Sequence, residues 1–222
     1  MQESDWTAVL AGTPVDSDMG VRVLESHGLT GRAFPLAEDP WQQTAFQLSD
    51  PAEKTAAVRG VLEGVREQGC RRAFVYCNSL SAAVDFPPLA AELGMRIVTP
   101  LEVYRTLAPQ YRRLGLIAAN AQGLAGIERT LYGANPALEL LGSCLLPVVV
   151  DIETGLDPAE LVERHHLPEL AEWLRRCGME ALVLGCTHFP YFKGVLAART
   201  SLPLIDPAEE MVLLLTWSEQ SH

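Results

Sequence analysis

Residues 181–190 decide the fold of this chain, and they read Ala-Leu-Val-Leu-Gly-Cys-Thr-His-Phe-Pro. The apolar run ends abruptly in glycine, cysteine, threonine and histidine. Four to eight apolar residues bounded by turn residues are typical of a buried strand in a parallel sheet. Groups that follow the C-terminal end of such a strand face the crevice in which open α/β sheets bind ligands. The stretch therefore predicts a parallel α/β protein with Cys186 at a ligand-binding edge.

A second copy of this arrangement lies earlier in the chain. Residues 72–76 (Arg-Ala-Phe-Val-Tyr) precede Cys77, Asn78 and Ser79. Two strands that each lead into a cysteine and small polar residues predict two thiols facing one ligand site. Predicted strands alternate with helices along the whole sequence, which favours parallel sheets flanked by helices.

We therefore expect an α/β fold of two similar lobes, each a mainly parallel sheet flanked by helices, with the active-site cleft between them. Residues 1–98 form the expected first lobe, to which the C-terminal segment, from about 200 to 222, returns. Residues 99–199 form the expected second lobe.

Local patterns predict the elements between these strands. Residues 12–17 are expected to form a loop between a strand and a helix that begins near Met19. Residues 39–43 are predicted to be a loop. Asp50 followed by Pro51 predicts the start of a helix that runs to about Gln68, and residues 100–113 are predicted to be a helix capped by Thr99. Residues 145–152 form the most strand-like segment of the second half, which Glu153-Thr154-Gly155 ends.

Composition limits the partners. The formal net charge of −11 argues against a nucleic-acid partner, since binding phosphate backbones needs a basic face. The longest nearly apolar run, residues 140–150, is too short to span a membrane. The acidic start, residues 1–5, lacks the features of a signal peptide. Five cysteines without regular close spacing do not form a disulfide framework, so a reducing cytoplasm is the expected location.

The two thiols suggest acid–base chemistry. A thiolate is a good base and nucleophile, and a helix N-terminus favours it. Thiols on opposite faces of one carbon can invert it, because one removes a proton and the other returns a proton. Such a reaction needs no cofactor. For Cys70, Cys144 and Cys177 we expect only a space-filling role.

Other chemistry is open to Cys186 and His188. They could ligate a metal, but a structural zinc needs four ligands and no Cys-x-x-Cys or His-x-x-x-His pair completes the set, so we expect no metal site. They could form a cysteine-hydrolase pair, although residues two apart at the start of a helix rarely align as nucleophile and base.

These motifs resemble those of the aspartate/glutamate racemase superfamily. Residues 185–190 (Gly-Cys-Thr-His-Phe-Pro) look like the second cysteine motif of glutamate racemases, and Cys77-Asn78-Ser79 looks like their Cys-Asn-Thr. Asp16-Ser17 and residues 153–155 (Glu-Thr-Gly) are similar to the family's Asp-Ser and Glu-x-Gly. The resemblance runs over nearly the whole chain.

The resemblance implies racemisation of an acidic amino acid without pyridoxal phosphate or another cofactor. Carried over by position, Cys77 and Cys186 are the acid/base pair, and Asp16 and His188 assist them. The residues that would bind the substrate are Ser17, Asn78, Ser79, Glu153 and Thr187. Asp16 and Ser17 have a simpler interpretation as helix-capping residues. The expected partner is a small anionic amino acid or dicarboxylate-like molecule, and a homodimer is the candidate assembly.

Two departures leave the substrate open. Residues 18–21 (Asp-Met-Gly-Val) replace the glycine-rich run of glutamate racemases, and residues 119–122 (Ala-Asn-Ala-Gln) replace their Thr-x-x-Thr loop. Aspartate, another amino acid or a hydantoin remains a candidate. Related maleate isomerases and arylmalonate decarboxylases use the same fold. A two-lobed protein that binds a small ligand without catalysis is the rival from another class.

Overall fold

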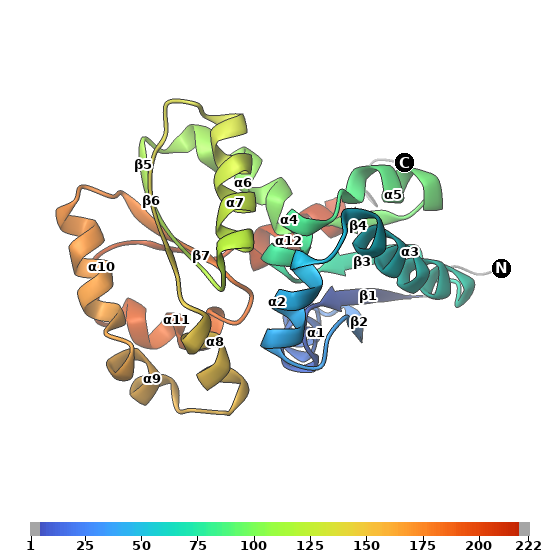
Figure 1. The fold of residues 1–222 in the computed structure, drawn as a ribbon, viewed down its shortest axis with the longest axis horizontal. Helices are drawn as coiled ribbons and strands as arrows, with labels where there is room; N and C mark the ends of the chain where they lie inside the picture. The colour runs from blue at the N-terminus through green and yellow to red at the C-terminus, as the bar shows by residue number, and fades with distance from the viewer. Residues whose placement is uncertain (1–4, 218–222) are drawn as a thin grey trace. The chain divides into compact units, whose positions relative to one another are not determined.

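The computed structural model describes residues 5–217. Residues 1–4, on which the signal-peptide prediction partly rests, lie outside this range. The chain divides into two units (Figure 1). The first runs to Val103 and resumes at Ala208, and the second spans Tyr104–Pro207. Each unit contains one four-stranded parallel sheet.

The first sheet has the strand order β2-β1-β3-β4. Its strands are β1 (Trp6–Ala11), β2 (Thr30–Pro35), β3 (Arg72–Val75) and β4 (Arg96–Val98). The helices of this unit are α1 (Pro14–Ser26), α2 (Pro40–Leu48), α3 (Pro51–Glu67), α4 (Asn78–Ala83), α5 (Phe86–Leu93) and α12 (Ala208–Trp217).

Helices bury both faces of this sheet. Side chains alternate along a strand, so Leu10 of β1 joins the core that α3, α4 and α5 complete. Val9, one residue earlier, joins the opposite core with Leu24 of α1 and Met211 of α12. A strand covered on both faces must be apolar throughout, which explains the continuous hydrophobic runs in the sequence.

The second sheet repeats the first, with the order β6-β5-β7-β8. Its strands are β5 (Arg113–Ala118), β6 (Glu139–Cys144), β7 (Ala181–Gly185) and β8 (Leu204–Ile205). The helices are α6 (Pro100–Leu107), which begins in the first unit, α7 (Ala121–Ala134), α8 (Leu146–Glu153), α9 (Pro158–Arg164), α10 (Leu167–Arg176) and α11 (Pro190–Ala197). The expected fold of two similar α/β lobes with parallel sheets is confirmed.

The strand predicted at residues 145–152 is wrong. The sixth strand ends at Cys144, which pairs with Ala118, and the apolar run that follows is helix α8. Val148, Val149 and Ile152 are the buried residues of α8, and their spacing is helical. Three consecutive valines favour a strand locally, so packing of one helical face onto the core outweighs that preference.

The loop predicted at residues 39–43 is also wrong. Asp39 caps α2, and its carboxylate accepts hydrogen bonds from the N–H groups of Trp41 and Gln42 at 2.8 Å each. Pro40 occupies the first turn, where its missing N–H costs nothing. The same Asp-Pro signal opens α3 at Asp50, where the sequence interpretation is confirmed.

Two further boundaries differ. Helix α1 begins at Pro14 rather than near Met19, and Thr13 is its N-cap, so Asp16 and Ser17 lie in its first turn. Helix α6 ends at Leu107 rather than at Arg113, because Pro109 lacks the N–H that would continue the helix.

A lobe boundary near residue 200 would place β8 in the first lobe, but β8 pairs with β7 in the second sheet.

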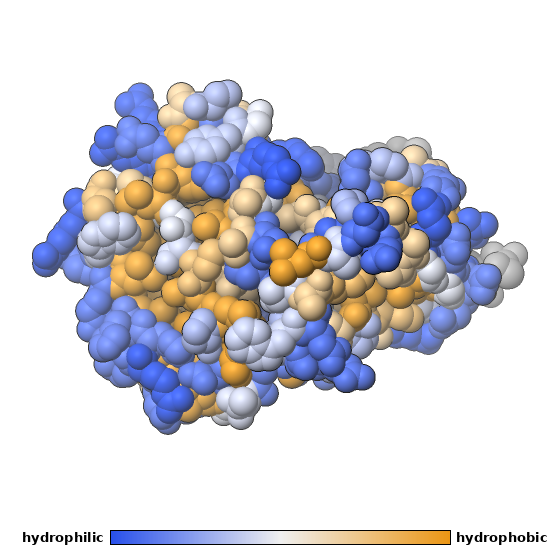
Figure 2. Space-filling view, in the orientation of Figure 1, coloured by the Kyte–Doolittle hydropathy of each residue, from blue (hydrophilic) through white to orange (hydrophobic). Residues whose placement is uncertain are grey.

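Within residues 5–217, no helix combines the length and the apolar character needed to cross a membrane. Hydrophilic residues line much of the face shown in Figure 2, with apolar residues between them.

Candidate active site

Cys77 lies at the C-terminal edge of the first sheet, two residues after β3. It is the N-cap of α4, and its Sγ accepts a hydrogen bond from the N–H of Leu80 at 3.5 Å. Only 2% of the residue is exposed. The thiol is therefore held in a defined position by the start of α4.

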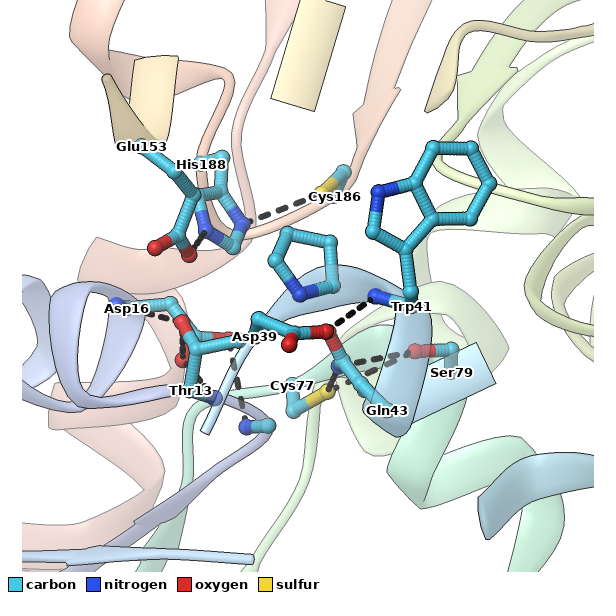
Figure 3. A network of polar contacts seen from close by, with 12 residues as sticks. Thr13, Asp16, Asp39, Trp41, Gln43, Cys77, Ser79, Glu153, Cys186 and His188 are labelled. Atoms are coloured by element: carbon cyan, nitrogen blue, oxygen red, sulfur yellow. Dashed lines mark hydrogen bonds and ion pairs between the residues drawn. The ribbon is translucent and has the colours of Figure 1, made fainter. Parts of the chain in front are cut away.

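Two glutamines of α2 lie beside Cys77 and Ser79 (Figure 3 shows Gln43). Nε2 of Gln43 donates to Cys77 Sγ at 3.0 Å and lies 3.4 Å from Ser79 Oγ. Nε2 of Gln47 donates to Ser79 Oγ at 2.6 Å. Gln43 and Gln47 are four residues apart and so share one face of the helix. Sequence interpretation missed both, because it placed the Gln43 segment in a loop; the Asp39-Pro40 signal would have found the helix.

Asp16 forms a capping box at the start of α1. Its carboxylate accepts hydrogen bonds from Thr13 N at 2.7 Å, Thr13 Oγ1 at 3.1 Å and Gly12 N at 3.2 Å. The residue is fully buried. These contacts give Asp16 the structural capping role considered from the sequence, with the difference that Thr13 is the N-cap and Asp16 the third helical residue.

Ser17 and Asn78 are also buried in the first unit. Ser17 Oγ is among the few buried polar side-chain atoms of residues 5–217 that have no hydrogen-bond partner there. Asn78 is the first residue of α4, directly after Cys77. The structure thus brings Cys77, Asn78 and Ser79 together with two glutamines; we name Cys77, Ser79, Gln43 and Gln47 the first thiol cluster.

In the second unit, Cys186, His188 and Glu153 are connected in one line (Figure 3). Sγ of Cys186 lies 3.6 Å from Nδ1 of His188, and Nε2 of His188 lies 2.7 Å from Oε1 of Glu153. We name these three residues the second thiol cluster. Cys186 is 8% exposed and His188 is 1% exposed, so solvent weakens the contacts little.

The close contact of Cys186 with His188 was not expected from their spacing. Helix α11 begins only at Pro190, and residues 186–189 form a turn closed by Phe189 N–H on the Cys186 carbonyl at 3.0 Å. Two side chains two positions apart can meet on such a turn, whereas on a helix they point in different directions. Thr187, between them, is buried.

Glu153 is the last residue of α8, and its partner is the imidazole of His188. The sequence predicted that Glu153 follows a strand, and this prediction is wrong because residues 146–153 are helical. The sequence marked Glu153 through its motif, but no local pattern shows which side chain it contacts, since His188 lies 35 residues further on.

Tyr104 of α6 is a further group that sequence interpretation missed. Burial raises its pKa well above the usual value, and the charges of Asp206 and Cys186 raise it further. The phenol therefore stays protonated near the second thiol cluster. Nothing in residues 100–107 marks Tyr104, because its role depends on burial and on distant charges.

Across the described part of the chain, no group of three or more histidine, cysteine, aspartate and glutamate side chains could hold a metal ion. Glu153 is connected to Cys186 only through His188, because its carboxylate contacts the imidazole. The three side chains therefore do not share one ligand position.

The two thiol clusters occupy equivalent places in the repeated fold. β3 and β7 have the same position in the orders β2-β1-β3-β4 and β6-β5-β7-β8. Cys186 follows β7 directly, and Cys77 follows β3 after one residue. The surroundings of the two thiols differ. Cys77 receives neutral donors, whereas Cys186 contacts an imidazole that a carboxylate holds.

The chain contains two parallel α/β units, each with one thiol at the carboxyl edge of its sheet. This arrangement defines a class of two-thiol α/β proteins, and comparison with known families supports that assignment. The model of the Asp/Glu/Hydantoin racemase family matches residues 42–215. The chain belongs to this family.

Among curated relatives, the chain is 35% identical to a glutamate racemase of Thermus thermophilus over 146 residues, which cover 64% of this chain and 52% of the relative. It is 30% identical to a glutamate racemase of Gloeobacter violaceus over 168 residues, covering 71% of this chain and 60% of that protein. The matches thus span little more than half the length of these relatives.

Solved structures show the same fold. The glutamate racemase of Francisella tularensis in complex with D-glutamate has a TM-score of 0.73 at 19% identity, covering 97% of this chain and 82% of that one. The glutamate racemase of Thermus thermophilus in complex with beta-chloro-D-alanine has a TM-score of 0.63 at 23% identity, covering 98% and 80%.

Proposed function

We propose that this chain is a cofactor-independent racemase of an acidic amino acid, in which Cys77 and Cys186 are the acid/base pair. The observation that carries the proposal is the duplication: each unit presents one buried thiol at the carboxyl edge of the equivalent strand. Family membership and relatives named glutamate racemase support the same reaction. The proposal requires both thiols to reach the α-carbon of one substrate.

The reaction is balanced without an oxidant or a cofactor. One thiolate removes the α-proton, and the electron pair of the broken C–H bond is delocalised into the carboxylate. The opposing thiol then donates its proton to the other face of the carbon. The first cysteine ends as a thiol and the second as a thiolate, so the enzyme is ready for the reverse direction.

Acid–base catalysis alone does not suffice, because an amino-acid α-proton is very weakly acidic and general catalysis supplies about 10²- to 10⁴-fold. Donors fixed around the substrate carboxylate must stabilise the developing charge. We propose Asn78 and Thr187, which directly follow the two thiols in the sequence, and Ser17, which the family resemblance implies, for this role. Ser79 Oγ instead contacts Cys77 Sγ and the two glutamines.

His188 and Glu153 have a different proposed role. The 2.7 Å contact between them orients the imidazole, whose other nitrogen is the one that faces Cys186. His188 therefore exchanges a proton with the thiol, and Glu153 is a positioning residue for His188 rather than a substrate ligand. For Asp16, the capping contacts support a structural contribution at the start of α1.

Exchange of the α-proton with D₂O tests the proposal. The purified chain is incubated with each enantiomer of glutamate and of aspartate and with a 5-substituted hydantoin, and deuterium at Cα and optical rotation are followed. We expect deuterium uptake and loss of rotation with at least one acidic amino acid. Cys77→Ser and Cys186→Ser should abolish racemisation, and Cys177→Ser, at an exposed thiol, should retain it. Tight binding of every candidate without exchange would instead establish a binding protein, and turnover of maleate or an arylmalonate an isomerase or decarboxylase.

The line from Cys186 through His188 to Glu153 favours a second candidate, a thiol hydrolase, because a nucleophile, a base and a group that orients the base form the arrangement of such enzymes. Incubation with p-nitrophenyl acetate distinguishes the two. A hydrolase gives a burst of nitrophenol and an acetyl group on Cys186 that then turns over. A racemase gives neither at a rate above that of Cys186→Ser.

A further inference from the structure

The hydrogen bonds of the first thiol cluster have a fixed direction. Ser79 Oγ accepts from Nε2 of Gln47 at 2.6 Å and from Nε2 of Gln43 at 3.4 Å. A hydroxyl group has two acceptor lone pairs and one proton. Both lone pairs of Ser79 are therefore used, and its proton is left to be donated. Cys77 Sγ, at 3.5 Å, is the acceptor that the structure gives it.

The sulfur of Cys77 is thus surrounded by donors. It receives Nε2–H of Gln43 at 3.0 Å, the N–H of Leu80 at 3.5 Å and the hydroxyl of Ser79. Among these three, Gln43 is the closest. A thiolate can accept all three of these hydrogen bonds. Hydrogen bonds to the charged form of a group favour that form.

The charged groups on the surrounding elements have hydrogen-bond partners of their own. Asp16 on α1 accepts its capping hydrogen bonds, and Asp39 caps α2. Lys54 on α3 donates from Nζ to the carbonyl of Gln47 at 2.8 Å, and α4 carries no ionisable side chain. The contacts of Cys77 Sγ described above, from the Gln43 amide, the Ser79 hydroxyl and the Leu80 N–H, are all made by neutral groups.

We propose that Gln43 is a positioning residue that stabilises the thiolate of Cys77, so that the first thiol cluster begins the reaction as the base. Gln47 supports it by directing the proton of Ser79 to the sulfur. The role of that thiolate in catalysis rests on the proposed function, but its stabilisation by Gln43 does not.

Substitution of Gly12 is a second way to displace the Gln43 side chain. A Cβ at Gly12 would overlap Nε2 and Cδ of Gln43, and its three nearest atoms all belong to that side chain. Gly12→Ala therefore forces the end of a flexible side chain away from the sulfur, and leaves the Gln43 residue itself in place.

The experiment measures alkylation of Cys77 by iodoacetamide across pH, resolved by peptide mass spectrometry on the full chain. The readout is the pH of half-maximal rate, normalised to the high-pH plateau so that changed access to the thiol does not count. A lost hydrogen bond to a charged group should raise this midpoint by about one to two pH units in Gln43→Leu. Gln43→Glu, which keeps the shape but places a carboxylate at the sulfur, should raise it at least as far.

Gly12→Ala should raise the midpoint in the same direction, and the double variant with Gln43→Leu should add nothing further. Gln42→Leu is the matched control, because Gln42 is exposed on the same helix and its Nε2 donates to Glu38. Alkylation of the exposed Cys177, measured in the same digest, is the internal control for the reactivity of the reagent.

Unchanged midpoints in both Gln43 variants would overturn the inference, as would an equal shift in Gln42→Leu. The outcome is separable from racemisation. Raised midpoints without Cα exchange would remove the proposed function and leave the role of Gln43 standing, and exchange with unchanged midpoints would do the opposite.

Discussion

Nε2 of His188 lies 2.7 Å from Oε1 of Glu153, a contact that connects the turn after β7 to the last residue of α8. Both side chains are largely buried, with 1% and 13% of their surface exposed. The contact leaves Nδ1 of His188 directed at Cys186 Sγ. One carboxylate therefore determines which imidazole nitrogen serves the thiol.

This contact predicts the effect of Glu153→Gln. The amide keeps the size of the side chain but removes the negative charge that orients His188, so we expect kcat for racemisation to fall by about 10²-fold or more while KM changes little. Steady-state kinetics with both enantiomers measure it. Glu160→Gln, at an exposed carboxylate of α9, is the matched control. Full activity of Glu153→Gln would show that His188 does not depend on Glu153.

The capping box of α1 predicts a loss of stability in Asp16→Asn. The buried carboxylate accepts two backbone N–H groups and the hydroxyl of Thr13, and an amide offers only one oxygen to them. We expect the free energy of unfolding to fall by about 1–3 kcal/mol. Thr13→Ala should cost about 1 kcal/mol. Urea denaturation measures both, and the double variant should cost less than their sum. An Asp16→Asn protein as stable as wild type would refute the capping role.

A close approach at the end of β7 predicts that Gly185→Ala is destabilising. The added Cβ would lie 2.7 Å from Cδ1 of both Ile127 and Leu116 and 2.8 Å from the Ile117 carbonyl oxygen. Because a backbone oxygen cannot move aside as a side chain can, we expect Gly185→Ala to lower the free energy of unfolding by about 1–3 kcal/mol.

Gly194→Ala provides the comparison. Nothing lies within 4 Å of a Cβ at this exposed position in α11, so the substitution should stabilise the helix by about 0.5–1 kcal/mol. Urea midpoints of the two variants, measured side by side, should move in opposite directions. A Gly185→Ala midpoint at or above that of wild type would contradict the packing described for β7.

Glu172 predicts a pH-dependent contribution to stability. Hydrogen bonds from Arg175 and Arg176 lower its pKa from 4.5 to about 2. A carboxyl whose pKa is lower in the folded state stabilises that state above pH 4.5, and the contribution is lost as the pH falls through about 2. The urea midpoint of Glu172→Gln should therefore lie below that of wild type at pH 7, with the gap narrowing as the pH falls below 4.5.

Because Glu172 and its partners are exposed, added salt should narrow the same gap at pH 7. The carboxyl chemical shift of Glu172, followed by NMR, measures the titration directly. A gap that widens on acidification would contradict the ion pairs described here.

The sequence predicted those features that depend on local patterns. The apolar runs before Cys77 and Cys186 identified the strands that carry the thiols, because a strand buried on both faces must be hydrophobic throughout. Asp50-Pro51 identified the start of α3. The equivalent Asp39-Pro40 signal starts α2, the helix that carries Gln43.

Local pattern failed where tertiary packing decides the outcome. Residues 146–153 contain three consecutive valines, yet they form α8 because the sheet position beside β5 is already filled by β6. The end of α8 then brings Glu153 to His188.

By itself, the sequence determined the duplicated parallel α/β fold, the place of both thiols at strand ends and the family that these motifs resemble. Only the tertiary structure decided what surrounds each thiol: Gln43 beside Cys77, and His188 with Glu153 beside Cys186. The physical reason is range. Strand and helix patterns repeat within a few residues, whereas the hydrogen bonds that set the chemistry of these thiols join residues 34 and 35 positions apart, which only the packing of helices on sheets brings together.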